Sequence, residues 1–366
     1  MNWNFNLPVK ILFGRNRAEE AVELTKELGS GLLVCDPFLA DGPARGMMRQ
    51  SQGRIAEIFS AISPNPAVEE VDACCEAIRR IDAKYLIAMG GGSVMDIAKA
   101  ASVIAFGEYP AREYHTGGKP LPQKHTPVFA IPTTAGTGSE VTSVSVLTDR
   151  QKGIKAPIGS PILYVNTAVI DPVLTLSVPP RVTASTGLDV LAHAIEGYWS
   201  VHHQPICDAA AMHASKLVFE NLLRVYENPQ DIDAREKMCE ASLMAGIAFS
   251  HPKTTGSHAC SYPLTNIYGM PHGEACAFTL GAFIRINADQ RVMELARYCG
   301  FDSVDAMADA VEDMKKKTGM KRTLADAGIY ADDVKKLAED SMHPNMLNNP
   351  VPMDVEAVER LYRGLV

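Results

Sequence analysis

Short apolar runs alternate with helical patterns along the first half of the chain. Four runs have the length and composition of buried strands: Gly31–Cys35, Tyr85–Met89, Val128–Ile131 and Val165–Ile170. The stretches between them carry apolar residues at helical spacing. A chain that alternates strands and helices in this way folds as a mainly parallel sheet wrapped by helices. The pattern therefore predicts an α/β domain.

The pattern changes at Val178-Pro179-Pro180, where the strand-like runs stop. Long helical patterns follow, at Thr183–Trp199, Asp208–Tyr226, Ala234–Phe249 and Gly273–Ala288. Proline cannot donate a backbone hydrogen bond and biases the preceding residue toward extended structure, so the double proline forms a boundary. The sequence predicts an α/β domain over residues 1–178 and an all-α domain over residues 179–366.

Composition narrows the class of protein. The 366 residues exceed one ordinary core, and 46% of them are hydrophobic, which fits two domains. The net charge of −8 comes from interspersed acidic and basic residues, so we expect no nucleic-acid partner. The eight cysteines lack CxxC spacing and are typical of reduced thiols, and no apolar run approaches the roughly 20 residues of a membrane span. Because the N-terminus also lacks a signal sequence, we expect a cytoplasmic protein with no membrane partner.

Four polar residues in the second half have the character of metal ligands. Asp189 and His193 lie four residues apart in a helical pattern and so face the same way, although this spacing is also common in solvated surface pairs. His258 follows a Thr-Thr-Gly-Ser stretch, and a Pro-His-Gly turn holds His272 at the start of a helix. One carboxylate and three imidazoles suit Fe(II) or Zn(II) and leave room for a substrate oxygen. No cysteine is included in this ligand set.

A strand, a glycine turn and a helix follow one another between Tyr85 and Ala100. The turn is Gly90-Gly91-Gly92-Ser93, and the backbone N–H groups at a helix N-terminus bind phosphate where glycines let it approach. The pattern differs from the GxGxxG fingerprint, so it does not imply an ordinary Rossmann site. A glycine turn with no ligand is the alternative. Asp96, early in the helix, either orients the end of the cofactor or caps the turn.

Hydroxyl side chains cluster in a loop that follows the third predicted strand. Four of them stand around two glycines: Thr133, Thr134, Thr137 and Ser139. Such a loop can donate hydrogen bonds to phosphate or ribose oxygens, and a polar surface loop is the alternative. Asp36 follows the strand Gly31–Cys35, where a carboxylate can accept from a ribose 2′-hydroxyl and would repel a 2′-phosphate. Asp36 therefore favours NAD over NADP.

Together these motifs resemble the group III, iron-dependent alcohol dehydrogenase family, whose fold is shared with glycerol dehydrogenase and dehydroquinate synthase. The resemblance runs nearly end to end and is carried by Leu7-Pro8, Phe13-Gly14, Asn65-Pro66, Gly90–Ser93 with Asp96, Thr133–Glu140, Asp171-Pro172, Asp189 with His193 and Glu196, and Pro271-His272-Gly273. It implies a dehydroquinate synthase-like fold with an N-terminal dinucleotide-binding domain and a helical metal-binding domain. It also implies a homodimer and one divalent ion, Fe(II) first and Zn(II) as the alternative.

Carried over position by position, the resemblance implies specific site residues. The implied metal ligands are Asp189, His193, His258 and His272. The residues that it places at NAD are Asp36, Asn65, Gly91, Gly92, Ser93, Thr133, Thr134, Thr137 and Lys155. Lys155 lies in a segment that matches the family only loosely, so a solvated lysine is the alternative there. Glu196, one turn after His193, either orients that histidine or pairs at the surface.

The chain departs from the family at two places. The family's second histidine, four residues after the first in the metal segment, is Tyr262 here. A phenol with an ordinary pKa of about 10 can donate a proton during aldehyde reduction but is a poor base at neutral pH. Lys253, Thr254 and Thr255 stand where many relatives have small apolar residues. A cation beside the metal indicates an anionic substrate, whereas an exposed lysine pairing at the surface is the alternative.

The sequence around Lys253 and Tyr262 resembles the phosphonoacetaldehyde reductase branch of phosphonate metabolism, which makes 2-hydroxyethylphosphonate. The resemblance thus implies an NAD(H)- and metal-dependent alcohol dehydrogenase or aldehyde reductase for a small anionic aldehyde. Tyr262 and Lys253 would be catalytic, and Lys253, Thr254 and Thr255 would contact the substrate. Three alternatives stay open: a general short-chain alcohol, lactaldehyde or diol dehydrogenase of the same family, a metal-dependent lyase or cyclase of the dehydroquinate synthase type, and a nucleotide-binding protein without chemistry.

Overall fold

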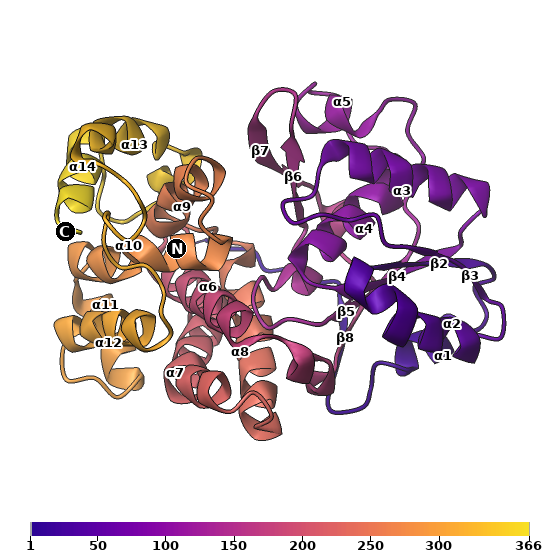
Figure 1. Ribbon diagram of the computed structural model, residues 1–366, viewed down its shortest axis with the longest axis horizontal. Coiled ribbons are helices and arrows are strands. Elements are labelled where there is room, and N and C mark those ends of the chain that lie inside the picture. The colour runs from indigo at the N-terminus through magenta and orange to yellow at the C-terminus, as the bar shows by residue number, and fades with distance from the viewer. Residues whose placement is uncertain (1, 366) are drawn as a thin grey trace. The chain divides into compact units, whose positions relative to one another are not determined.

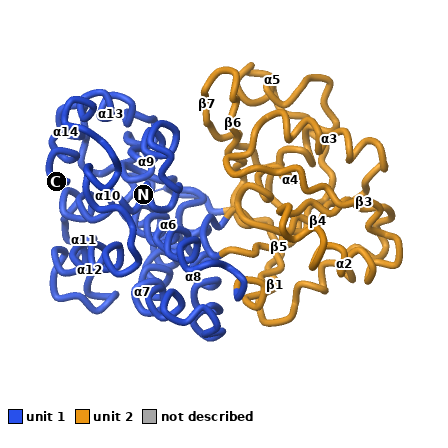
Figure 2. The backbone as a smooth tube through the Cα atoms, in the orientation of Figure 1, with its two compact units in different colours: residues 1–5, 135–138, 176–366 blue, residues 6–134, 139–175 orange. Residues whose placement is uncertain are grey.

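The computed structural model describes residues 2–365, which form two compact units (Figure 2). One unit holds residues 6–134 and 139–175 and contains all the strands. The other holds the residues up to Phe5, residues 135–138 and the residues from Leu176 onward, and it is helical. The division near Thr175 lies close to the double proline, and two short stretches from the first half of the chain belong with the helical unit.

A six-stranded parallel sheet forms the centre of the α/β unit, with the order β1-β8-β5-β4-β2-β3 (Figure 1). The strands are β1 (Lys10–Phe13), β2 (Gly31–Cys35), β3 (Ile55–Phe59), β4 (Tyr85–Gly90), β5 (Val128–Pro132) and β8 (Thr167–Ile170). The four inner strands are buried throughout, which is why their sequences are continuous apolar runs that could be recognised. The edge strands β1 and β3 are partly exposed and were not predicted from the sequence.

Helices cover the sheet and are joined to it by loops (Figure 1). The helices of this unit are α1 (Glu20–Leu24), α2 (Arg45–Gln50), α3 (Val68–Arg80), α4 (Gly92–Ile104) and α5 (Ala111–His115). Residues of α1 and α2, such as Val22 and Met47, pack with Leu33 and Cys35 of β2 in one apolar cluster. A separate antiparallel hairpin of β6 (Val144–Asp149) and β7 (Ile154–Gly159) was not predicted from the sequence.

The order of the strands creates a switch point between β2 and β4. From β2 the chain continues to β3 at one edge of the sheet, whereas from β4 it continues to β5 on the other side. Ligands of open parallel sheets bind beyond the carboxyl ends of the strands at such a point. The segments that leave these ends begin with Asp36 after β2, Gly91 after β4 and Thr133 after β5.

The helical unit contains no strand among its described residues. Its helices are α6 (Pro180–Trp199), α7 (Pro205–Glu227), α8 (Ile232–Ser250), α9 (Gly256–Asn266), α10 (His272–Ile286), α11 (Gln290–Tyr298), α12 (Val304–Lys317), α13 (Val334–Asp340) and α14 (Val355–Arg363). The predicted α/β region followed by an all-helical region is confirmed. Helix α6 starts with proline at its first position, where the missing N–H costs no helical hydrogen bond, and is buried on nearly all sides from Thr183 onward.

Two general expectations bear on the environment of the chain. The eight cysteines are free thiols, and all of them except Cys299 are buried. Among residues 2–365, no helix joins sufficient length to sufficient apolar character to cross a bilayer.

Candidate metal centre and nucleotide site

Asp189 and His193 lie on one face of α6, in the core of the helical unit. The Asp189 Oδ1 atom is 3.8 Å from His193 Nδ1, as their spacing of one helical turn predicts. Their exposed fractions are 3% and 5%, which excludes a solvated surface pair. The His193 ring stacks on the Phe249 ring of α8 at a centroid distance of 4.2 Å, so its orientation is fixed by packing.

His258 stands in the first turn of α9 and is held by Glu196. One oxygen of the Glu196 carboxylate accepts the Nδ1–H of His258. The other accepts the Ser257 N–H at 2.8 Å, and also accepts from the Thr255 and His258 N–H groups at 3.2 Å. Glu196 therefore satisfies N–H groups at the start of α9 and holds the Nδ1–H of His258, so that Nε2 is the ring nitrogen that faces Asp189 Oδ1 at 3.6 Å. It orients His258 and not His193, and its full burial rules out a surface pair.

The third imidazole and an unpredicted thiol come from α10. His272 begins that helix, and its ring centroid is 5.6 Å from that of His258. One turn later stands Cys276, with Sγ 3.8 Å from His272 Nε2. Donor atoms of Asp189, His258, His272 and Cys276 all lie within 4.8 Å of one another. The sequence analysis left every cysteine out of this cluster, and the spacing of four residues after His272 was the signal that could have found Cys276.

Three buried polar atoms in this cluster lack hydrogen-bond partners. They are Asp189 Oδ1, His193 Nδ1 and His258 Nε2. Asp189 Oδ1 is 3.6 Å from His258 Nε2 and 3.8 Å from His193 Nδ1, so it lies near both of these imidazole nitrogens, although His193 is not among the donors that all lie within 4.8 Å of one another. Buried polar atoms are normally paired, and leaving three unpaired together would be costly. A divalent cation bound among them would satisfy all three, so the residues fit the metal that the donor set implies.

The pKa values of these groups are shifted in different directions by burial and by their neighbours. Burial alone would raise the pKa of Asp189, but the imidazoles of His193, His272 and His258 hold it well below its usual range. Burial lowers the pKa of His193 to about 4, so that imidazole is neutral at physiological pH. Burial opposes a charge on His258, but Cys276, Glu196 and Asp189 beside it raise its pKa well above the usual value, so an ion bound there would take the place of the extra proton on that imidazole.

In the α/β unit, Asp36 and the glycine turn meet at the switch point of the sheet. Asp36 Oδ2 accepts the Gly91 N–H at 3.1 Å. A Cβ at Gly90 would come within 2.6 Å of that oxygen and 2.5 Å of Val94 Cγ2, so only glycine fits there. Beyond the turn, α4 begins at Gly92. The first N–H groups of a helix have no partner within the helix, and the helix dipole makes this end positive. Thr134 lies beside the turn, because its Oγ1 would be 3.4 Å from a Cβ on Gly91. The arrangement suits a pyrophosphate at the turn.

Other predicted nucleotide residues are connected to one another. Lys155 Nζ donates to Asn65 Oδ1 at 2.8 Å, so these two residues, which are 90 positions apart, form one group. Asn65 has a φ of +54°, in the left-handed region that asparagine tolerates better than most residues. Thr133 Oγ1 is buried and has no partner, which leaves its hydroxyl for a ligand. Thr137 belongs to the stretch 135–138 of the helical unit.

Asp96 and Ser139 are hydrogen bonded to one another and to neighbouring elements. Ser139 Oγ donates to Asp96 Oδ1 at 2.9 Å, and Val146 N–H donates to Asp96 Oδ2 at 3.0 Å. The ammonium of Lys99 donates to Ser139 Oγ at 2.7 Å and to the Ser139 carbonyl oxygen at 2.9 Å, and its side chain is fully buried. These contacts bind α4 to the end of the hydroxyl-rich loop and to β6. Asp96 and Ser139 therefore stabilise the packing of α4 against this loop and β6.

Sequence comparison identifies the family. A family model described as iron-containing alcohol dehydrogenase matches residues 8–172, and one described as Fe-containing alcohol dehydrogenase family, C-terminal, matches residues 183–366. The chain is 33% identical to choline dehydrogenase of Bacillus subtilis, over 98% of this chain and 94% of that protein. The chain belongs to the iron-containing alcohol dehydrogenase family. It is also 34% identical to 1-propanol dehydrogenase PduQ of Salmonella typhimurium, over 91% of this chain and 92% of that protein.

Solved structures of iron-containing alcohol dehydrogenases and their relatives have the same fold. Sulfoacetaldehyde reductase from Bifidobacterium kashiwanohense, solved in complex with NAD+, is 51% identical to the chain, with a TM-score of 0.97 over 100% of this chain and 99% of that one. A 1,3-propanediol oxidoreductase is 29% identical, with a TM-score of 0.93 over the whole of both chains. The chain is thus an oxidoreductase of the iron-containing alcohol dehydrogenase family with a dehydroquinate synthase-like fold.

The segment between α8 and α9 carries the predicted substrate residues. Lys253 is exposed, has a φ of +69°, and donates from Nζ to the Ser250 carbonyl oxygen at 3.1 Å, where a cation suits the C-terminal end of α8. Thr254 is buried and accepts from Asn345 Nδ2 at 2.8 Å. Thr255 is fully buried, and its hydroxyl donates to Glu196 and accepts from Trp199 Nε1, both at 2.8 Å. Thr255 supports the metal centre and leaves the proposed substrate contacts.

Tyr262, which replaces the family's second histidine, has a histidine beside it after all. Its ring stacks on the ring of His343 at a centroid distance of 4.2 Å. Asn345, two residues later, hydrogen bonds to Tyr262 and to Thr254. Burial raises the pKa of Tyr262, so its phenol keeps its proton at neutral pH. Sequence analysis missed His343 and Asn345 because no spacing relates them to α9.

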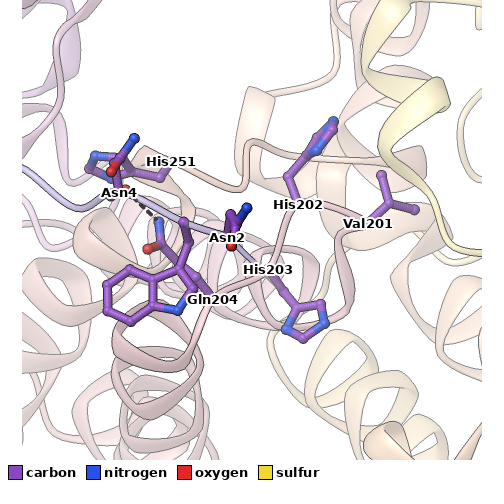
Figure 3. Close-up of a pocket in the computed structure, with 8 residues that line it drawn as sticks. Asn2, Asn4, Val201, His202, His203, Gln204 and His251 are labelled. Carbon is purple, nitrogen blue, oxygen red and sulfur yellow. Dashed lines mark hydrogen bonds between the residues drawn. The ribbon is translucent and has the colours of Figure 1, made fainter.

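A pocket of about 380 Å³ lies elsewhere in the helical unit (Figure 3). It is lined by Asn2, Trp3, Asn4, Val201, His202, His203, Gln204 and His251. The dashed contact in Figure 3 is the hydrogen bond from Gln204 Nε2 to the Asn4 carbonyl oxygen. The four predicted metal ligands are absent from its lining. His202, His203 and His251 line this pocket and are not among the donors grouped at the candidate metal centre.

Proposed function

We propose that this iron-containing alcohol dehydrogenase is an NAD(H)- and metal-dependent reductase that converts a small anionic aldehyde to its alcohol. The observation that carries the substrate class is the 51% identity to a sulfoacetaldehyde reductase over the whole chain. The donor cluster of the helical unit and the glycine turn at the sheet's switch point support the two cofactors. The aldehyde that we propose has two carbons and carries a sulfonate or a phosphonate.

The two cofactors and the chain divide the chemistry between them. A divalent ion supplies Lewis acidity toward the carbonyl oxygen when it is bound, and NADH supplies the hydride. Asp189, His193, His258 and His272 would hold the ion. Reduction also consumes one proton, which the Tyr262 phenol would give to the developing alkoxide, directly or through a water. Glu196 keeps His258 oriented throughout the reaction.

On the nucleotide side, the α/β unit supplies the binding groups. The turn at Gly91 to Ser93 would take the pyrophosphate against the N-terminus of α4. Thr133 and Thr134 would donate to phosphate or ribose oxygens. Asp36 would accept from the ribose 2′-hydroxyl with the oxygen that does not bond Gly91. The pair Asn65 and Lys155 completes this set of polar groups.

The anionic group of the substrate requires a complementary charge. Lys253 is the cation that we propose for this role. Neutral polar groups would come from Thr254, which follows it in the sequence, from Asn345, which donates to Thr254 Oγ1, and from His343, whose Nδ1 accepts the Asn345 N–H. The bond from Lys253 Nζ to the Ser250 carbonyl leaves two of the three ammonium hydrogens for an oxyanion. A charge-assisted hydrogen bond contributes about 1.5–3 kcal/mol, so its loss should weaken binding roughly 10- to 100-fold.

The test compares Lys253→Ala with wild type on sulfoacetaldehyde, phosphonoacetaldehyde and propanal, with NADH oxidation as the assay. We expect wild type to prefer the two anionic aldehydes, and Lys253→Ala to raise KM for them roughly 10- to 100-fold while KM for propanal changes little. Lys237→Ala is the matched control, because Lys237 forms a surface ion pair with Glu240. An enzyme that prefers propanal would contradict the anionic substrate. Equal effects on all three aldehydes would remove Lys253 from the site.

A general short-chain alcohol dehydrogenase is the second candidate. The observation in its favour is that the curated relatives include proteins named choline dehydrogenase and 1-propanol dehydrogenase, at 33% and 34% identity. The same assay separates the two functions, because a general enzyme would reduce propanal with a kcat/KM at least as high as that for the anionic aldehydes.

A further inference from the structure

A thiol lies among the donor atoms of the candidate metal centre. Cys276 is fully buried and follows His272 by one turn of α10, so the two side chains share a face. Its Sγ is 3.8 Å from His272 Nε2 and 4.0 Å from His272 Nδ1. With Asp189, His258 and His272 it forms the set whose donor atoms all lie within 4.8 Å of one another.

We propose that Cys276 is a thiolate ligand of the ion held by Asp189, His258 and His272. The proposal rests on the proposed function only in assuming that an ion binds at this cluster. With Cys276 the chain offers a sulfur donor in addition to one carboxylate and three imidazoles. The sulfur, and not the fold, is what distinguishes this centre from one built of nitrogen and oxygen donors alone.

The distances fit a shared ion. A zinc ion lies about 2.3 Å from a thiolate sulfur and about 2.0–2.1 Å from an imidazole nitrogen, so two such ligands at a tetrahedral angle stand roughly 3.6 Å apart. The separation of 3.8 Å between Cys276 Sγ and His272 Nε2 is close to that value. The separation of 3.6 Å between Asp189 Oδ1 and His258 Nε2 fits the same ion.

The surroundings of Cys276 argue against a purely apolar role. A buried cysteine usually behaves as a small apolar side chain. Here donor atoms of Asp189, His258 and His272 lie within 4.8 Å of the thiol, and Asp189 Oδ1 and His258 Nε2 are buried without hydrogen-bond partners. His193 approaches Asp189 Oδ1 as well, yet it falls outside the set of mutually close donors that includes Cys276. The thiol therefore stands where a further ligand is expected.

A thiolate ligand changes which ion the site prefers. Sulfur is a soft donor that suits Zn(II) and Co(II) better than Fe(II), whereas imidazole and carboxylate accept all three. We expect Cys276→Ser to weaken Zn(II) binding about tenfold or more, since even residues that only support ligands change metal affinity 10- to 100-fold. Fe(II) binding should change less, so the preference for Zn(II) over Fe(II) should fall.

The experiment uses the full-length enzyme, stripped of metal with a chelator and reloaded with Co(II). The wild type should show a thiolate-to-cobalt charge-transfer band in the near ultraviolet together with the visible cobalt bands. Cys276→Ser and Cys276→Ala should keep the visible bands and lose the charge-transfer band. Cys299→Ser, which changes the one partly exposed cysteine, should retain both. Zn(II) and Fe(II) affinities are measured on the same proteins by competition with a chelator.

Two results would overturn the proposal in different ways. Visible cobalt bands without a charge-transfer band in the wild type would show a metal centre that lacks the thiolate, leaving the proposed function intact. Failure of Co(II) and Zn(II) to bind the wild type at all would remove both the thiolate and the metal centre. Because Cys276→Ala and Cys276→Ser differ in polarity, loss of the band in both, with unchanged circular dichroism, separates ligation from misfolding.

Discussion

The α-carbon of Gly273 lies against the carbonyl group of Ser185. A Cβ at Gly273 would stand 2.0 Å from the Ser185 oxygen and 2.9 Å from Asp189 Cβ. The neighbouring Glu274 N–H donates to Ser185 Oγ at 3.1 Å, which fixes the same contact. Helices α6 and α10 meet at this point, and the close approach holds His272 beside Asp189.

Gly273→Ala should therefore damage the metal centre through packing alone. The added methyl must displace backbone, because the atom it meets is a carbonyl oxygen and not the end of a flexible side chain. We expect about 1–3 kcal/mol of lost stability and a clear loss of Zn(II) affinity, measured by denaturant unfolding and chelator competition. Gly46→Ala is the control, because a Cβ at Gly46 meets nothing within 4 Å. Unchanged metal affinity in Gly273→Ala would contradict this account of the helix contact.

Glu196→Gln should weaken metal binding without touching a ligand. The carboxylate holds the Nδ1–H of His258 and accepts the N–H groups at the start of α9, and an amide can do only part of this. We expect Zn(II) affinity to fall roughly 10- to 100-fold, as for other carboxylates that orient a ligating histidine. Glu240→Gln is the matched control, because Glu240 bonds the surface residue His213 at 2.8 Å. Equal metal affinity in the two variants would show that Glu196 stabilises the start of α9 but does not affect metal binding through His258.

Asp36→Ala should relax the choice between NAD and NADP. Burial raises the pKa of Asp36, and the Gly91 N–H opposes that effect. The Asp36 carboxylate would accept from the ribose 2′-hydroxyl of NAD and repel the 2′-phosphate of NADP. Replacing it with alanine should therefore weaken NAD binding and improve NADP binding. Dissociation constants for both cofactors, measured by nucleotide fluorescence quenching, give the ratio. Asp41→Ala, which breaks only an exposed ion pair with Arg45, should leave the ratio unchanged.

The fold was predictable where burial is uniform along an element. The inner strands β2, β4, β5 and β8 are buried at every position, so their sequences are almost entirely apolar. The edge strands and the hairpin β6–β7 carry alternating or mixed burial that no run reveals. Helices of the second half were located because their apolar residues recur at a helical period, with ends differing by a few residues.

The site was predictable as far as sequence spacing and family resemblance reach. Asp189 and His193 are linked by helical spacing, whereas His258 and His272 were grouped with them by residue type and local motif and then by the resemblance. The roles of Thr255 and Ser139 could not be read in this way, because their partners Glu196 and Lys99 are set by tertiary contacts. A hydroxyl in a polar motif looks available in a sequence even when the fold has already used both its donor and its acceptor.

Lys99 predicts a dependence of stability on pH. Burial lowers its pKa to about 8 from 10.5, so between these values the unfolded chain holds a proton that the folded chain has released. The contribution of Lys99 to stability therefore rises as the pH increases from about 8 to 10.5. The difference in free energy of unfolding between wild type and Lys99→Met should therefore grow by about 2–3 kcal/mol from neutral pH to high pH. Denaturant unfolding of both proteins near pH 8 and near pH 10.5 measures this difference. For the exposed Lys237→Met the same difference should stay flat across this range.

Tyr262→Phe tests the proton step. The phenol keeps its proton at neutral pH because burial raises its pKa, and it sits one turn after His258 on α9. If it donates the proton, its loss should lower kcat for aldehyde reduction by roughly 10²–10⁴ with little change in KM, since a positioned general acid acts in the transition state. The fall of kcat at high pH in wild type should also disappear in the variant. Tyr268→Phe removes another tyrosine whose pKa is raised by burial and should leave kcat and its pH profile unchanged. A Tyr262→Phe enzyme with wild-type kcat would assign the proton to water or to the ribose of the cofactor.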